Sequence, residues 1–245
     1  NGVFREGAFI CNIGTGGQIS SFSQKPVSDR QLRTQTFCHG FPGAYTVYGA
    51  VLNAGMSLKW LKDQILQETD FRQMSRMAGQ VPSGSEGLIF LPYLTGERTP
   101  LMNPDARGIF FGLHLTHTRA HMARAVMEGV TFALRESMEI LEELGLPCDR
   151  ILSSGGGASS PVWLQIQADI FGKEVQVCRV KEQACLGACM LAGTAAGIYP
   201  DVGEAARQLA VPAPKIYRPG EAAAEAYRKQ YEKYREIYRQ VKDLF

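Results

Sequence analysis

Three consecutive glycines, at positions 155–157, separate an apolar run from an amphipathic run in the second half of the chain. Residues 150–152 before them favour a strand, and residues 162–171 after them favour a helix. Ser160 is a typical N-cap and Pro161 a typical first helical residue. The pattern predicts a strand, a glycine turn and a helix start. A ligand can lie on such a backbone, and an anion can meet its free N–H groups.

A second glycine turn, Gly14-Thr15-Gly16-Gly17, lies near the N-terminus between two runs that favour strands. A hydroxyl flanked by glycines, as at Thr15, can donate to a phosphate oxygen together with neighbouring backbone N–H groups. Two such turns in one chain suggest a nucleotide held by its two ends. The alternative is that both are ordinary tight turns, because short glycine motifs often occur without a ligand.

The size and charge of the chain exclude several classes of function. Its 245 residues, 45% hydrophobic and 20% charged, are typical of a globular protein of one large domain or one and a half average ones. The formal net charge of +2 gives no electrostatic case for nucleic acid or a membrane surface as partner. No apolar run approaches the length of a membrane span, and no secretory signal is visible.

The cysteines and the first residues indicate the setting of the chain. None of the six cysteines forms a Cys-x-x-Cys pair, and most lie in apolar runs. This favours reduced, buried cysteines in a cytoplasmic protein over a disulfide framework. The chain begins at Asn1, without an initiator methionine, and almost at once enters a strand-like run. We therefore expect a piece of a longer protein.

Hydrophobic periodicity predicts an α/β domain with a mixed sheet, since strands come first and then alternate with helices. Strands are expected at residues 8–13, 18–22, 34–38, 45–51, 87–94, 109–113, 151–153 and 174–179. Helices are expected at residues 52–67, 70–77, 118–144, 161–171, 186–196, 204–210 and 221–243.

Two groups of side chains at helical spacing have a structural and a functional interpretation. On one helix, His114, His117 and His121 could face one metal ion, but the stretch reads as a loop leading into a helix. It also lacks the Cys or acidic ligand of most zinc sites, so no metal site is predicted. The tyrosine stripe of the last helix is predicted to be its buried face. Its members are Tyr227, Tyr231, Tyr234 and Tyr238.

Glu97 and Arg98 follow the apolar run at residues 87–94. Loops at strand ends often carry function, but a local ion pair that shapes the loop is the alternative. No paired carboxylates, Ser/His/Asp set or Walker-type loop is evident in the sequence. No residue of the chain is therefore predicted as a general base.

Taken together, these segments resemble the C-terminal domain of the FGGY family of carbohydrate kinases, with the xylulokinase branch as the best match. The resemblance covers essentially the whole chain. Its most specific motif is Leu-Pro-Tyr-Leu-x-Gly-Glu-Arg-Thr-Pro at residues 91–100. Further matches lie at residues 13–17, 36–39, 53–60, 103–108, 155–157 and 186–188.

The resemblance implies that residues 1–245 form one actin-like ATPase domain, of the ribonuclease H-like class, with a mixed sheet flanked by helices. In this family the C-terminal domain mainly binds ATP, and the N-terminal domain mainly binds the sugar. The whole enzyme would move the γ-phosphoryl group of MgATP onto a ketose hydroxyl. The catalytic aspartate, the magnesium-binding aspartate and the sugar contacts are expected upstream of residue 1. The chain alone is therefore expected to be inactive.

The same resemblance implies an ATP site on this chain. Thr15 matches the threonine that contacts the phosphates, and Gly55 matches a glycine that borders the nucleotide. Gly156 and Gly157 resemble the glycines under the adenosine. The complete set of expected ATP-binding residues is Gly14, Thr15, Gly16, Gly55, Lys59, Gly156 and Gly157.

Two positions depart from the family pattern, and one alternative function stays open. Lys59 stands where glycerol kinase has a nucleotide-contacting glutamine, and Pro161 stands where some relatives place an asparagine near adenine. The alternative is a stand-alone actin-like module that binds a nucleotide or a protein and does no chemistry. A hydrophobic face left by a missing domain favours the kinase half, whereas a surface that is polar all round favours the module.

Overall fold

The computed structural model describes residues 2–68 and 70–245, and its centre is a six-stranded sheet with the order β3-β4-β2-β1-β7-β8. The strands are β1 (Gly7–Ile13), β2 (Gly17–Ser23), β3 (Gln35–Cys38), β4 (Tyr45–Val51), β7 (Cys148–Gly155) and β8 (Glu174–Val177). β1, β7 and β8 run parallel, whereas β1 to β4 are joined antiparallel. The predicted mixed sheet is confirmed. A small second sheet pairs β5 (Ile89–Leu91) with β6 (Ile109–Phe111).

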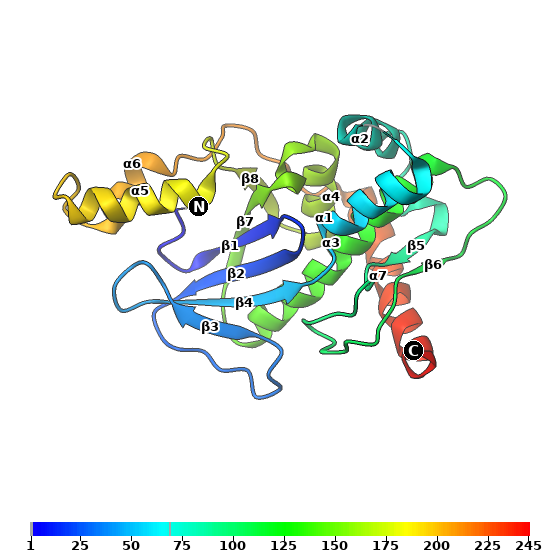
Figure 1. The fold of residues 1–245 in the computed structure, drawn as a ribbon, viewed down its shortest axis with the longest axis horizontal. Coiled ribbons are helices and arrows are strands. Elements are labelled where there is room, and N and C mark those ends of the chain that lie inside the picture. Colours follow the sequence, from blue (N-terminus) through cyan, green and yellow to red (C-terminus); the bar gives the residue numbers. More distant parts are fainter. Residues whose placement is uncertain (1, 69) are drawn as a thin grey trace.

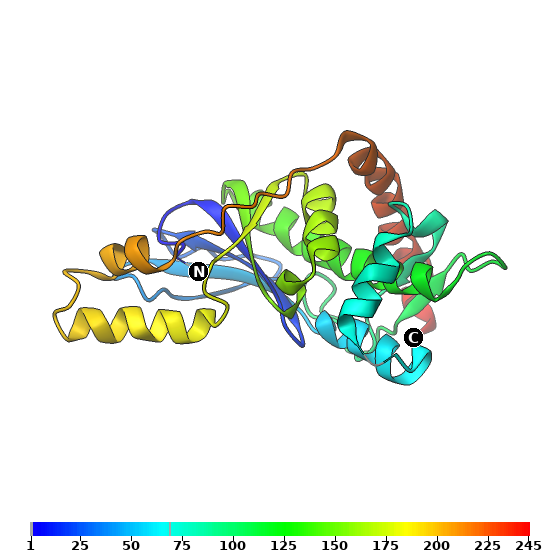
Figure 2. The ribbon, with the colours of Figure 1, turned by 90° about the horizontal axis from the view of Figure 1, so that it is seen from above.

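Helices cover the sheet unequally. They are α1 (Gly55–Trp60), α2 (Phe71–Gly79), α3 (Arg119–Glu143), α4 (Pro161–Phe171), α5 (Gln183–Ala195), α6 (Val202–Leu209) and α7 (Glu221–Val241). α3 and α4 pack on the sheet, and α7 packs on them in turn. α5 and α6 pack against each other. Together they form an arm, called the α5 arm below, that projects from the side of the molecule opposite to α2 and α7 (Figures 1 and 2).

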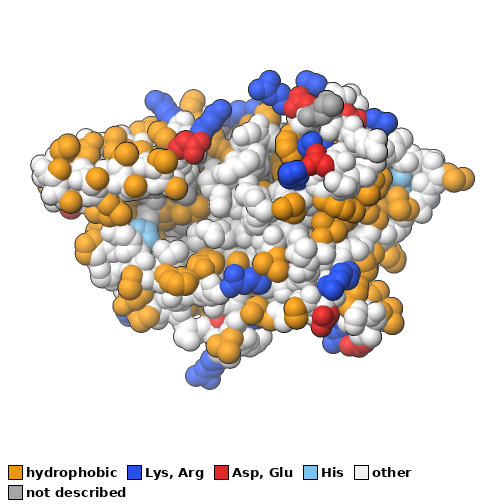
Figure 3. All heavy atoms as spheres, viewed as in Figure 1, with side chains coloured by type: hydrophobic (Ala, Val, Ile, Leu, Met, Phe, Trp, Pro, Cys, Tyr) orange, Lys and Arg blue, Asp and Glu red, His pale blue; other side chains and the backbone are white. Residues whose placement is uncertain are grey.

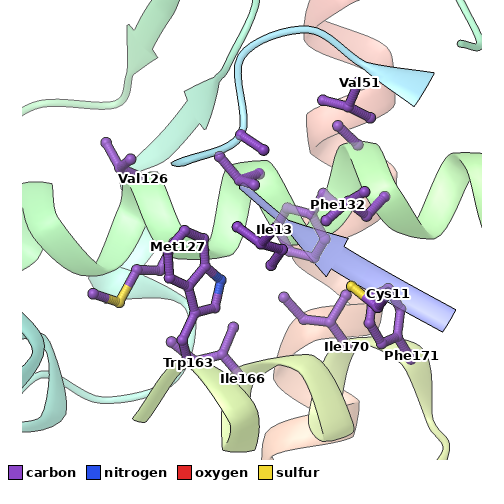
Figure 4. Packing of buried hydrophobic residues seen from close by; sticks show 14 of the residues in the cluster. Cys11, Ile13, Val51, Val126, Met127, Phe132, Trp163, Ile166, Ile170 and Phe171 are labelled. Carbon is purple, nitrogen blue, oxygen red and sulfur yellow. The ribbon is translucent and has the colours of Figure 1, made fainter. Parts of the chain in front are cut away.

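The core lies between the sheet and helices α3 and α4. Alternate residues of β1 point into it, and Cys11 and Ile13 lie close to Phe132 of α3 and to α4 (Figure 4). The indole N–H of Trp163 donates to Thr131 Oγ1 at 3.0 Å, so its one polar group is satisfied. Each fully buried large side chain stabilises the fold by about 1.5–3 kcal/mol. The carboxyl end of β1 is therefore firmly anchored.

Local capping contacts fix several helix starts, of which the one at Ser160 was predicted from the sequence. Ser160 Oγ accepts the N–H of Trp163 at 3.1 Å, and α4 spans the predicted residues 161–171. Asp70 caps α2 in the same way through the N–H of Arg72. Thr118 and His121 form a capping box at the start of α3. These ends depend on neighbours in sequence, which explains the agreement.

Several predicted elements have other bounds in the structure, among them one helix and one strand. The helix expected at residues 52–67 begins only at Gly55, because residues 52 and 53 bond to the loop that follows β5. It continues as a π-helix over Leu61–Leu66. The strand expected at residues 87–94 is only Ile89–Leu91, since Pro92 has no N–H to continue the ladder.

The structure tests the tyrosine and cysteine predictions. Tyr227, Tyr231 and Tyr234 are buried and Tyr238 is partly buried, which confirms the predicted inner face of α7. All six cysteines are free, but Cys38, Cys185 and Cys189 are exposed. The prediction of burial is wrong for those three, because β3 is an edge strand and α5 has little packed around it. In the described part of the chain, no helix has the length and apolarity needed to cross a membrane.

Candidate functional site

The two glycine turns lie side by side at one edge of the sheet. β1 and β7 are parallel neighbours, and their register places Ile13 opposite Gly155. Both turns therefore begin where a parallel strand ends (Figure 1). Ligands of α/β sheets bind in the crevice outside the carboxyl ends of the strands. Segments about 140 positions apart in the sequence thus form one surface.

The first turn is held by the start of α1. The N–H of Gly55 donates to the carbonyl of Gly14 at 2.9 Å, and the N–H of Met56 donates to the carbonyl of Thr15 at 2.9 Å. A Cβ on Gly55 would collide with the Gly14 carbonyl oxygen. A Cβ on Gly16 would lie 3.0 Å from the Val51 carbonyl oxygen. Two of the expected site glycines therefore have a packing reason to be glycine.

Thr15 stands free at the tip of this turn. It is exposed, and its hydroxyl makes no hydrogen bond within residues 2–68 and 70–245. The carbonyls of Gly14 and Thr15 accept hydrogen bonds from the first residues of α1, so the backbone at Thr15 is held in place. Its hydroxyl remains available to a ligand. The geometry thus leaves one donor pointing at no partner in the protein.

The three glycines of the second turn differ in what they permit. Gly155 has φ +76°, and a Cβ there would lie 2.5 Å from the Ile13 carbonyl oxygen. A Cβ on Gly157 would lie 2.7 Å from Cβ of Ile13, so this glycine lets the turn pack on β1. A Cβ on Gly156 would meet nothing nearer than 3.8 Å. Gly156 alone is both exposed and open to a ligand.

Lys59 does not join this surface through its charge. Its ammonium group pairs with Asp63, one turn further along the same helical segment, and the side chain is 58% exposed. Pro161 occupies the first position of α4, as predicted from its rigid φ. Neither residue adds a polar group to the two turns.

Two polar residues at the strand ends were not singled out from the sequence. Asn12 and Ser154 are the neighbours of the two turns, and Ser154 Oγ donates to Asn12 Oδ1 at 3.3 Å. On the other side, Ser75 of α2 lies 2.6 Å from Ser160, oxygen to oxygen, which brings α2 to the second turn. A polar residue interrupting the end of an apolar strand is the signal that could have identified Asn12 and Ser154.

Glu97 is a buried carboxyl close to the first turn. Its side-chain oxygen Oε1 accepts the N–H of Leu52 at 2.8 Å and the N–H of Arg98 at 2.7 Å. The residue is 2% exposed, and burial raises the pKa of its carboxyl to about 7. The contact to Arg98 uses the backbone N–H, so Glu97 shapes its loop by accepting backbone hydrogen bonds.

The histidine cluster lies apart from the glycine turns, in the loop before α3 and in its first turn. The rings of His114 and His117 are 3.8 Å apart between centroids, and His121 Nε2 lies 3.3 Å from Glu86. Across the described residues, no group of three or more His, Cys, Asp or Glu side chains is placed to hold a metal ion.

A cavity of about 640 Å³ lies at the opposite end of β1, lined in part by Arg5, Arg150 and Arg207. It sits at the amino ends of β1 and β7. The crevice rule for α/β sheets favours the carboxyl ends of the strands instead.

The molecular surface at the centre of Figure 3 is hollowed and mostly white, the colour of the backbone and of uncharged polar side chains. Such a surface suits a ligand that lies on the main chain. We therefore take the glycine turns as the candidate site.

Comparisons with known proteins show the family of the chain. The model of the FGGY family of carbohydrate kinases, C-terminal domain, matches residues 9–196. The chain is 36% identical to a xylulose kinase of Bacillus subtilis over 243 residues, 99% of this chain and 48% of that protein. It is 40% identical to a gluconokinase of the same organism over 207 residues, 80% of this chain and 40% of that protein.

The fold is shared as well. The crystal structure of a ligand-bound xylulose kinase from Lactobacillus acidophilus superimposes with a TM-score of 0.88 at 31% identity, covering 98% of this chain and 49% of that chain. The predicted fold class, an actin-like ATPase domain with a mixed sheet flanked by helices, is confirmed. The chain spans about half the length of the relatives it matches.

Proposed function

Because this chain belongs to the FGGY family of carbohydrate kinases, we propose that it is the nucleotide-binding half of a sugar kinase. The whole enzyme transfers the γ-phosphoryl group of MgATP to a sugar hydroxyl. Xylulose is the first candidate substrate, which would place the enzyme in xylose metabolism, and gluconate is the second, since relatives of both names match. The observation that carries the proposal is the meeting of two glycine turns at one sheet edge.

In this proposal the two turns hold opposite ends of the nucleotide. Thr15 Oγ1 and the backbone N–H groups of Thr15 and Gly16 face the phosphates, whereas the N–H of Gly14 is donated to the carbonyl of Gly16. The open backbone at Gly156 lies under the adenosine. Gly16 and Gly55 let the phosphate turn pack tightly against the end of β4 and the start of α1. Phosphoryl transfer needs mostly positioning and charge stabilisation from the protein, and backbone donors and hydroxyls supply both.

The remaining parts of the catalytic machinery belong, in our proposal, to another half of the protein. The magnesium ion arrives with the ATP phosphates, and its protein ligands are assigned to that other half. The catalytic base and the sugar contacts are assigned there too. Closure of the two halves then excludes water from the transferring group.

The α5 arm favours this proposal over a stand-alone module. Leu186 and Met190 are buried against α6, yet Leu191 is 47% and Ile198 70% exposed. No charged residue occurs from position 183 to position 200. Hydrophobic side chains are spread over the arm in Figure 3. An uncharged surface with exposed apolar side chains is typical of a contact with another protein segment. In our proposal, the other half of the kinase supplies that segment.

We place the protein in the cytoplasm. Its six cysteines are free, and three of them are exposed, which suits a compartment that keeps thiols reduced.

A coupled ADP-release assay on the full-length protein tests the proposal. With MgATP and either xylulose or gluconate, we expect turnover that depends on the sugar, and no turnover from residues 1–245 alone. The proposal would be overturned if the rate of ATP hydrolysis did not change on addition of either sugar. Sugar-dependent turnover by the 245-residue chain alone would overturn it as well.

A further inference from the structure

The loop after β5 is bonded to the end of β4 through several polar contacts. Glu97 Oε1 accepts the N–H of Leu52 at 2.8 Å, and Asn53 Nδ2 donates to the carbonyl of Gly96 at 3.2 Å. Thr95 Oγ1 donates to Asn53 Oδ1 at 3.0 Å. Residues 52 and 53 are thereby held in a non-helical conformation immediately before α1.

The segment held in this way is the same one that supports the phosphate turn. Gly55 and Met56 donate to the carbonyls of Gly14 and Thr15, and Gly17 pairs with Val51 in the sheet. Only two residues separate Leu52 from Gly55. A shift of the backbone at Leu52 therefore moves Gly55 and Met56, and with them the carbonyls of Gly14 and Thr15 that accept their hydrogen bonds.

The carboxyl group of Glu97 is costly to bury and is not explained by packing alone. It is 2% exposed, and its second oxygen, Oε2, is buried with no hydrogen-bond partner among the described residues. Removing the carboxyl would leave the partly buried N–H groups of Leu52 and Arg98 without this acceptor, which costs more than the bonds themselves contribute. Glu97 thus contributes to the structure by accepting hydrogen bonds from two backbone N–H groups.

We propose that Glu97 is the positioning residue of the phosphate turn: through the N–H of Leu52 it fixes the segment whose amides hold Gly14 and Thr15. It touches no substrate and acts through the backbone. This inference rests on the proposed nucleotide site, and it assigns to the Glu-Arg-Thr-Pro loop a role in phosphate binding.

Three variants of the full-length protein separate positioning from a general loss of stability. Glu97→Leu removes the acceptor, and Glu97→Gln keeps Oε1 and both backbone bonds. Glu136→Leu is the matched control: Glu136 is also a buried carboxyl with a raised pKa of about 8, and its charge interacts with that of Glu97, but it accepts no hydrogen bond from residues 52–57. In each variant, amide hydrogen exchange of residues 12–18 and 52–57 is measured without ligand, followed by kcat and KM for MgATP and for the sugar.

Glu97→Leu should speed exchange in both segments and lower kcat/KM for MgATP by roughly tenfold to a hundredfold, as small misplacements of catalytic groups do. Its KM for the sugar should stay unchanged, Glu97→Gln should restore most of the activity, and Glu136→Leu should leave both segments protected. Unchanged protection in Glu97→Leu, or an equal loss in Glu136→Leu, would overturn the inference. The exchange result needs no nucleotide, so it stands or fails separately from the kinase proposal, which fails if the unmodified protein shows no turnover.

Discussion

Ile13 and Gly155 lie opposite each other at the ends of two parallel strands, so close that a Cβ on Gly155 would come within 2.5 Å of the Ile13 carbonyl oxygen. This approach places the two glycine turns on one surface. It also gives the second turn a strict steric requirement at one position, because Gly155 has φ +76° as well.

Gly155→Ala should therefore destabilise the chain by roughly 2–4 kcal/mol, from backbone strain together with overpacking against Ile13. Gly172→Ala is the matched control, since Gly172 has φ +64° but open space around its Cβ position. That variant should lose only about 1 kcal/mol, the cost of the left-handed backbone. Urea unfolding of both variants measures the difference, and equal losses would mean that contact with Ile13 is unimportant.

Thr15→Ala in the full-length protein should lower kcat more than it raises KM for ATP. A donor aimed at the transferring phosphates strengthens its bond as charge develops, so its loss acts on the chemical step. By analogy with oxyanion-hole donors, the loss is about 3 kcal/mol, roughly a hundredfold in rate. Thr15→Ser should keep much of the activity, because it retains the hydroxyl.

Steady-state kinetics of both Thr15 variants decides the question, with Thr116→Ala, an exposed loop threonine far along the chain, as the control. If Thr15→Ala has the same kcat as the unmodified protein, the Thr15 hydroxyl does not take part, and only the backbone N–H groups of this turn can bind the phosphates.

The buried carboxyls of Glu97 and Glu136 should make the free energy of unfolding depend on pH. Burial raises the pKa of Glu97 to about 7 and that of Glu136 to about 8, from an ordinary value of 4.5. The folded state therefore keeps protons that the unfolded chain releases. Their contribution is fully present below about pH 4.5 and is lost as the pH rises towards 8. Each carboxyl can contribute a slope of up to about 1.4 kcal/mol per pH unit.

Urea unfolding of the chain across this range should show stability falling towards pH 8, and the double variant Glu97→Gln, Glu136→Gln should flatten the profile. A wild-type profile that rises or stays level between these limits would mean that both groups are already ionised in the folded protein.

The α5 arm supplies a test of the proposed contact with another half of the protein. Leu191→Glu should leave the fold of this chain intact, because the side chain is 47% exposed and packs on little. In the full-length protein the same change should weaken the contact between halves and lower activity. Leu115→Glu, in a fully exposed loop position, is the control and should change neither. Loss of folding in the isolated chain would show that Leu191 belongs to the core of this domain.

Much of the fold follows from local signals in the sequence. Ser160 and Pro161 fix the start of α4 by capping geometry, and the tyrosine spacing in α7 identifies its inner face. Such features depend on residues a few positions apart, so a single sequence contains them.

The support of the site depends on contacts that no local pattern contains. Glu97 and Leu52 are 45 positions apart, and only the folded loop brings them together. The same holds for Gly157, whose lack of a side chain serves packing on Ile13. Lys59 stays a predicted contact; in the structure its ammonium group pairs with Asp63, four positions away on the same helical segment.

Backbone amide chemical-shift mapping of residues 1–245 with MgATP shows whether the two glycine turns hold a nucleotide. We expect shifts at residues 14–17, 55 and 155–157, and weak binding because, in our proposal, another half of the protein completes the cleft. Those shifts should be lost in Gly156→Trp but not in Gly156→Ala. Shifts that gather instead around Arg5, Arg150 and Arg207, and that persist in Gly156→Trp, would contradict this expectation.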